Sequence, residues 1–170
     1  SIMKLQHKSL VFFFSLLIST FSFAQKKVNS PAETVSGKIN GATITIKYGS
    51  PSVKGRAIWG ALVPYDKVWR AGANDATTFE TDKTITIEGK QLPAGKYSFF
   101  VIPNENESII IFNKEAKQWG SYDYKASSDQ LRVTVKNENG DALVEKLEYK
   151  IMETRIELLW EKLIIGFEVK

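Results

Sequence analysis

The sequence predicts an all-β protein, an antiparallel β-sandwich of roughly ten short strands. Two observations predict this fold class. Apolar and polar residues alternate with a period of two through several separate runs, which is typical of strands with one buried and one solvated face. Turn residues separate these runs, and no long segment has the convincing spacing of an amphipathic helix.

Alternation is clearest in four runs. Threonine or charged residues fill most positions between their apolar residues, so each run predicts one strand of a half-solvated sheet. The apolar positions are Ile44 and Ile46; Ile85 and Ile87; Leu131, Val133 and Val135; and Leu143, Leu147, Tyr149 and Ile151.

Two further runs, residues 97–102 and 109–112, are apolar on both parities. A strand with this composition is buried on both faces, so we expect these two runs to be central strands. One face would pack in the core of the sandwich. A loop would cover the other face.

Turn residues predict where strands end. Short polar segments at 88–90, 93–95 and 103–106 predict turns, and Asn139-Gly140 is a dipeptide typical of a two-residue hairpin. Near the C-terminus, residues 156–160 and 163–169 alternate on different parities around Glu161-Lys162. This pattern favours two strands of a closing hairpin, with a short helix over 154–162 as the alternative.

Residues 1–24 have the pattern of a secretory signal peptide. A basic stretch from Lys4 to Lys8 precedes an apolar run, and Ser22 and Ala24 are small residues at the end of it. The apolar run of about fourteen residues is shorter than the roughly 20 that a membrane-spanning helix needs. We therefore expect an exported protein, periplasmic or extracellular, that is not inserted in a membrane after cleavage.

Cleavage after Ala24 would leave 146 of the 170 residues, enough for one domain without disulfides, since the chain has no cysteine. It would also remove two lysines and the only histidine, which leaves 21 basic and 19 acidic residues. Basic and acidic residues alternate along the strands, so we expect no nucleic-acid partner. Residues 25–33 are polar and predict a flexible lead-in, followed by a single β-sandwich domain over 34–170.

One set of motifs resembles a known family. The motifs are Tyr48-Gly49-Ser50-Pro51, Gly55-Arg56, Ile58-Trp59-Gly60, Val63-Pro64-Tyr65, Val68-Trp69-Arg70, Gly72-Ala73-Asn74, Ala76-Thr77-Thr78, Leu92-Pro93-Ala94-Gly95, Ile102-Pro103, Asn113-Lys114 and Trp119-Gly120. Together they resemble a secreted bacterial family catalogued as domain of unknown function 2911. The resemblance implies an exported all-β domain and assigns no reaction and no catalytic residue.

Composition restricts the chemistry. Without cysteine or a mature histidine, Ser-His-Asp and Cys-His nucleophilic sites are excluded, and zinc and copper sites lose their favoured ligands. The loop 123–129 does not match a calcium-binding loop, so we expect no metal and no cofactor. Paired carboxylates could hydrolyse glycosides, although no spacing selects a pair. The candidate acids are Asp66, Asp75, Glu80, Asp123 and Asp129.

Residues 48–78 concentrate tryptophan, tyrosine, arginine, glycine and proline. Aromatic faces stack on sugar rings or peptide groups, and planar guanidinium groups bind carboxylates. We therefore expect a binding patch drawn from residues 48–78 and 119–124. Its candidate binding residues are Lys54, Arg56, Trp59, Tyr65, Arg70 and Asn74.

These observations favour a non-catalytic binding module for a small molecule, glycan or peptide. Two alternatives stay open. One is a carboxylate-dependent hydrolase acting on glycans, and the other is a structural, envelope-associated protein. The structural alternative requires that residues 48–78 be mostly buried, whereas the binding module requires cationic and aromatic side chains at an open surface.

Overall fold

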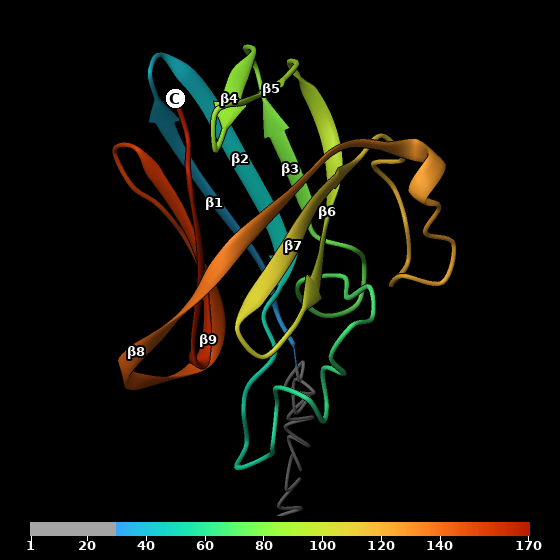
Figure 1. Cartoon of the computed structure of the whole chain (residues 1–170), viewed down its shortest axis with the longest axis vertical. Coiled ribbons are helices and arrows are strands. Elements are labelled where there is room, and N and C mark those ends of the chain that lie inside the picture. The colour runs from blue at the N-terminus through green and yellow to red at the C-terminus, as the bar shows by residue number, and fades with distance from the viewer. Residues whose placement is uncertain (1–29) are drawn as a thin grey trace, which may run out of the picture.

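A computed structural model describes residues 30–170 of the chain. The predicted signal peptide and residues 25–29 of the predicted lead-in lie outside the described residues. Over the described part the protein is all-β, as predicted (Figure 1). Its elements are β1 (Ala32–Ile39), β2 (Ala42–Gly49), β3 (Thr78–Thr81), β4 (Ile85–Ile87), β5 (Lys90–Leu92), β6 (Gly95–Pro103), β7 (Glu107–Asn113), the short 3₁₀ turn η1 (Ala126–Ser128), β8 (Asp129–Ile151) and β9 (Arg155–Glu168).

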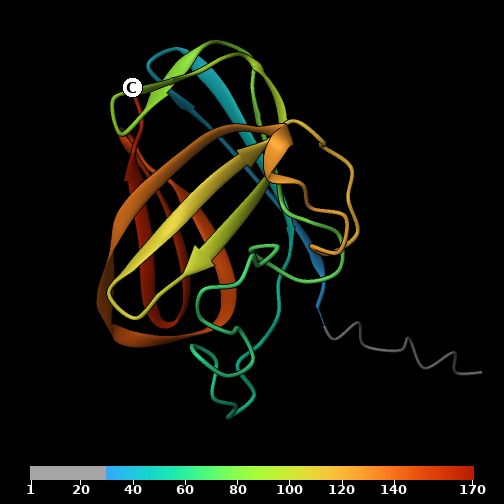
Figure 2. The same ribbon diagram turned by 45° about the vertical axis from the view of Figure 1, so that its right-hand side comes forward.

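Seven strands form one antiparallel sheet in the order β1-β2-β3-β6-β7-β8-β9, and β4 and β5 form a separate hairpin. The large sheet curls around its interior, with β6 and β7 on one side (Figure 2). Backbone hydrogen bonds join distant parts of the curl. Leu147 in β8 donates to the Pro51 carbonyl at 3.0 Å, and Val53 donates to the Glu145 carbonyl at 2.8 Å.

The C-terminal end of the chain pairs with the small hairpin. The backbone N–H groups of Thr86 and Lys170 each donate to the other residue's carbonyl, at 2.7 and 3.1 Å. This hairpin lies at the end of the molecule opposite to the long connection between β2 and β3 (Figure 1).

The core fills the interior of the curl. Four phenylalanines at its centre form edge and tilted ring contacts, with centroids 5.0 Å apart for Phe79 and Phe112 and 5.9 Å apart for Phe99 and Phe167. Such contacts add specific aromatic stabilisation to the burial of large apolar areas. Isoleucines and leucines from the alternating runs surround them.

The two central strands are buried on both faces, as predicted. Their outer face carries Phe100 and Ile111, which are fully buried. The connection between β2 and β3 covers them with Ala76 and Val68, and the segment between β7 and β8 covers them with Tyr124. The predicted covering loop is therefore two segments.

The predicted hairpin at Asn139-Gly140 is wrong, because these residues lie inside β8. From Asn139 to Val144, β8 advances five residues while its partner β9 advances only two. The surplus residues form a bulge that bends the strand instead of reversing it. An Asn-Gly pair favours a turn only where the flanking residues can pair with each other, and here both flanks pair with β9.

The predicted closing hairpin at the C-terminus is also wrong, because β9 is one continuous strand. Glu161 has a φ of 57°, and the pairing register with β8 shifts beside it. This bulge changes which parity faces the core, so Trp160 and Leu163 are both buried although they lie on different parities. At the other end, β1 begins at Ala32, inside the segment that the sequence assigns to the lead-in.

Candidate functional site

The connection between β2 and β3, residues 50–77, is anchored by two glycines that touch backbone to backbone. The Ala73 N–H donates to the Gly49 carbonyl at 3.1 Å. A Cβ on Gly49 would lie 2.2 Å from the Ala73 carbonyl oxygen, and a Cβ on Gly72 would lie 2.9 Å from the Gly49 oxygen. Only glycine permits this approach, so the sequence fixes the position of residues 70–74 against the end of β2.

A strained residue follows Arg70. Ala71 is fully buried and has a φ of 56°, a conformation that costs an alanine roughly 1–2 kcal/mol. Its carbonyl accepts hydrogen bonds from the Thr77 hydroxyl at 2.9 Å and from the Tyr149 hydroxyl at 2.6 Å. Burial raises the pKa of Tyr149, so its phenol stays protonated and keeps donating. These two bonds offset the strain and hold the backbone next to Arg70.

Three of the four tryptophans pack together. The rings of Trp69 and Trp160 are stacked 6.2 Å apart, and Trp59 meets both of them edge-on. Trp160 is buried in the core, whereas Trp59 and Trp69 are half-buried. Trp119 is instead 60% exposed. The aromatic residues of 48–78 are therefore mainly a wall of the core and do not form one open platform.

A cavity of about 230 Å³, here named the Arg70 cavity, opens beside this cluster. It is lined by Ser30, Pro51, Arg56, Leu62, Val63, Trp69, Arg70, Gly72, Ala73 and Trp160. No carboxylate lines it. Its polar side chains are thus two arginines and one serine, and the side chains of its other lining residues are apolar.

The two arginines differ in their contacts. Arg56 donates from Nε to the Val53 carbonyl at 3.0 Å and from Nη2 to the Ser52 carbonyl at 2.6 Å, so its own loop orients it. The Arg70 side chain has no hydrogen bond or ion pair within residues 30–170, and its Nε is buried without an acceptor. A buried charged donor without a partner is unfavourable.

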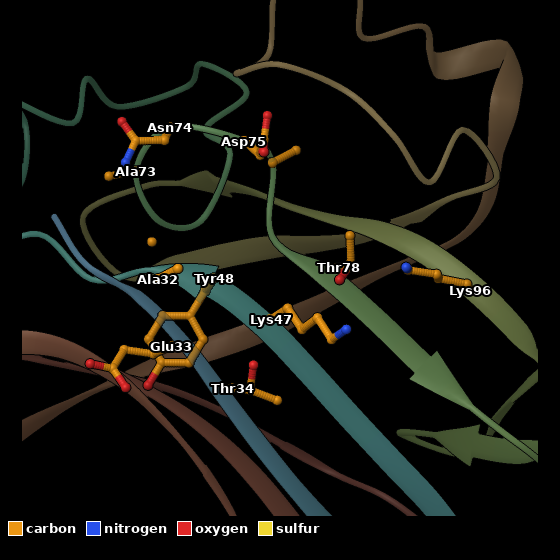
Figure 3. A pocket seen from close by; sticks show the side chains of 12 residues that line it. Ala32, Glu33, Thr34, Lys47, Tyr48, Ala73, Asn74, Asp75, Thr78 and Lys96 are labelled. Atoms are coloured by element: carbon orange, nitrogen blue, oxygen red, sulfur yellow. The ribbon is translucent and has the colours of Figure 1, made fainter.

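A second depression, here named the Lys47 groove, has a volume of about 290 Å³ (Figure 3). The outer face of the strands forms its floor and residues 73–76 form its upper wall. Its lining residues are Ala32, Glu33, Thr34, Lys47, Tyr48, Gly49, Ala73, Asn74, Asp75, Ala76, Thr78 and Lys96. Ala73 lines both the Lys47 groove and the Arg70 cavity.

The candidate binding residues are distributed over different places. Arg56 and Arg70 meet in the Arg70 cavity, and Asn74 lies in the Lys47 groove with a φ of 64°. Trp59 and Tyr65 line a separate pocket of about 220 Å³ that also contains Glu105 and Glu161 among other residues. Lys54 is exposed in a turn, and its backbone N–H donates to the Glu145 carboxylate at 2.9 Å.

The Lys47 groove was not predicted from the sequence. Its floor residues occupy the polar positions of alternating strands, which are expected at any solvated surface. Only the pairing of β2, β3 and β6 brings Lys47, Thr78 and Lys96 together. The exposed Trp119 and Tyr122, also part of the predicted patch, lie on the segment between β7 and β8. The structure brings this segment against residues 74–76, because the Ala76 N–H donates to the Gln118 carbonyl at 2.9 Å and the Gly120 N–H donates to the Asn74 carbonyl at 3.2 Å.

The candidate acids do not form a catalytic pair in these cavities. Asp75 lines the Lys47 groove, whereas Asp66 accepts a hydrogen bond from Asn104. Asp129 is held by Arg132 at 2.7 Å and by the Tyr124 hydroxyl at 2.6 Å. Among residues 30–170, no three His, Cys, Asp or Glu side chains gather as a metal site would require.

The comparisons with known proteins agree with the resemblance and add no activity. The family described as "Protein of unknown function (DUF2911)" matches residues 30–169. No curated protein and no solved structure matches the chain. In the part of the chain that the structure describes, no helix has the length and apolar character to span a bilayer.

Proposed function

Because the chain belongs to the family "Protein of unknown function (DUF2911)", whose description names no activity, we propose from the site itself that it is a non-catalytic binding module for a small anionic ligand. The ligand places a carboxylate, or a group of similar charge and shape, in the Arg70 cavity. Its apolar part lies against the aromatic wall.

The observation that carries this proposal is the state of Arg70. Arg70 lines a cavity whose lining contains no carboxylate, and its side chain has no hydrogen bond or ion pair within residues 30–170. A carboxylate matches the planar fork of a guanidinium and forms two charge-assisted hydrogen bonds with it. Each hydrogen bond to a charged group contributes about 1.5–3 kcal/mol, so the bonds between one carboxylate and Arg70 suffice for weak, specific binding of a ligand.

Two further features support the same ligand class. Arg56 is already oriented by its own loop, so binding does not have to immobilise it. Trp69 is held by two backbone hydrogen bonds with Val101, at 2.8 and 2.9 Å, which keeps the aromatic wall rigid. Leu62, 48% exposed, adds apolar surface at the cavity.

Export belongs to the proposal as well. The signal-peptide pattern of residues 1–24 supports a periplasmic or extracellular location, where small acids, glycans and peptides are available as ligands. N-terminal sequencing of the protein recovered outside the cytoplasm tests this part. A mature N-terminus at Gln25 is expected, and recovery of the intact chain from the cytoplasm would contradict it.

Binding is tested by calorimetry and thermal melting with octanoate and phenylacetate, each beside its uncharged amide. The acids are expected to raise the melting temperature and the amides are not. Arg70→Gln should weaken acid binding about 10- to 100-fold. Lys90→Gln, which removes one positive charge on the distant small hairpin, should leave it unchanged. The proposal would be overturned if Arg70→Gln bound the acids as tightly as the parent protein does, or if the parent protein bound an acid and its amide equally well.

A further inference from the structure

The floor of the Lys47 groove brings two lysines to one hydroxyl group. Lys47 in β2 is the pairing partner of Thr78 in β3. Two residues further along β3, Glu80 is the pairing partner of Lys96 in β6, so Lys96 is the diagonal neighbour of Thr78 on the same face. Figure 3 shows the Lys47 and Lys96 side chains extending toward the Thr78 hydroxyl from two sides.

Neither lysine forms an ion pair within the described residues, although Glu80 lies on the same face as the pairing partner of Lys96. Glu33 and Asp75 also line the groove, but Figure 3 shows their carboxylates directed away from Thr78. Two ammonium groups that face one point repel each other, and an anion between them relieves that repulsion.

The hydroxyl groups of the floor are available too. Thr78 and Thr34, which pairs with Lys47 from the other side, have no side-chain hydrogen bond within the described residues. The groove therefore offers two cations and the Thr78 hydroxyl to one oxyanion group, with the Thr34 hydroxyl on the far side of Lys47. A carboxylate, sulfate or phosphate group has the acceptors to use them.

The groove is next to the Arg70 cavity. Ala73 lines both, and its N–H is bonded to Gly49, two residues along β2 from Lys47. Two residues of a strand cover roughly 6.6 Å, so Lys47 lies about that far along β2 from the contact with Ala73, and we take the two anion positions to be on the order of 10 Å apart. We infer that the Lys47 groove is a second anion subsite, and that the ligand carries two anionic groups, one at Arg70 and one between Lys47 and Lys96. This inference rests on the proposed function.

The test compares dicarboxylates with monocarboxylates of the same chain length by calorimetry on the purified protein. The pairs are succinate with butyrate, suberate with octanoate, and sebacate with decanoate. At least one of the longer dicarboxylates should bind more tightly than its monocarboxylate, by about 5- to 30-fold, because two exposed ammonium groups each contribute modestly. Succinate should gain nothing, since it cannot reach both positions.

The variant Lys47→Gln/Lys96→Gln should remove this advantage and leave monocarboxylate affinity within about two-fold. Both lysines are exposed, so the variant is expected to fold normally. Lys83→Gln/Lys90→Gln removes the same charge from other exposed positions and should keep the advantage. If no dicarboxylate binds more tightly, or if the Lys47/Lys96 variant keeps the gain, the second subsite is overturned while Arg70-dependent monocarboxylate binding leaves the proposed function standing. Absence of binding by every acid overturns both.

Discussion

Replacing Gly49 by alanine tests whether the two cavities depend on one backbone contact. The new Cβ would lie 2.2 Å from the Ala73 oxygen and 2.9 Å from its carbonyl carbon. Restoring an ordinary contact requires the end of β2 and residues 72–74 to separate by roughly 1 Å. That movement breaks the 3.1 Å hydrogen bond from Ala73 to Gly49. The lost bond contributes about 1 kcal/mol and the overpacking about 1–3 kcal/mol, so Gly49→Ala should destabilise the fold by about 2–4 kcal/mol.

Urea unfolding, followed by tryptophan fluorescence, measures this loss. At an m value of about 1–3 kcal/mol per molar urea, the midpoint should fall by about 0.7–4 M. Gly140→Ala is the matched control, because its Cβ would make only ordinary contacts, at 3.4 Å with the end of the Ile164 side chain and at 3.7 Å with the Lys162 carbonyl oxygen. That variant should stay within about 0.5 kcal/mol of the parent protein. If Gly49→Ala is as stable as Gly140→Ala, residues 72–74 are not held as the structure indicates.

Two other stability predictions follow from buried aromatic groups. Burial raises the pKa of Tyr149 above its ordinary value, so above about pH 10 the unfolded chain loses a proton that the folded chain keeps, and stability should fall by up to about 1.4 kcal/mol per pH unit. Tyr149→Phe should flatten that decline in urea unfolding measured from pH 8 to pH 11, and an unchanged slope would contradict the buried phenol. Trp160→Ala should lower the free energy of unfolding by about 3–5 kcal/mol, because it removes the core member of the tryptophan cluster. Trp119→Ala, at an exposed position, should change it by less than about 0.5 kcal/mol, and similar losses for both variants would refute the assignment of core and surface.

The fold class could be predicted from the sequence because a strand with one buried face requires apolar residues at every second position. Ile44 and Ile46 face the core as predicted, and the runs around Phe100 and Ile111 are covered on both faces. Turn chemistry was less decisive. Asn139-Gly140 lies in a bulge because both of its flanks pair with β9, a fact of tertiary pairing that the dipeptide does not contain.

The candidate site was predictable as a region but not as a geometry. The concentration of aromatic residues, arginine, glycine and proline pointed to residues 48–78, but the role of each of these residues depends on partners that are distant in the sequence. Trp160 in β9 packs against the rings of Trp59 and Trp69, so these two side chains form part of the core wall. The pairing across β3 joins Lys47 to Lys96, although no local pattern links the two residues.

The way the curled sheet closes has a consequence for how the chain folds. The hydrogen bonds that join Pro51 and Val53 to β8, and Thr86 to Lys170, connect residues more than eighty positions apart in the sequence. Such contacts require large loops to close before they contribute, so folding should be slow for a domain of this size, on the order of milliseconds to seconds. The connection that carries Arg70 is held partly by β8. The connection therefore reaches its final shape only after strands near the C-terminus have formed, and a chain without those strands would lack the Arg70 cavity.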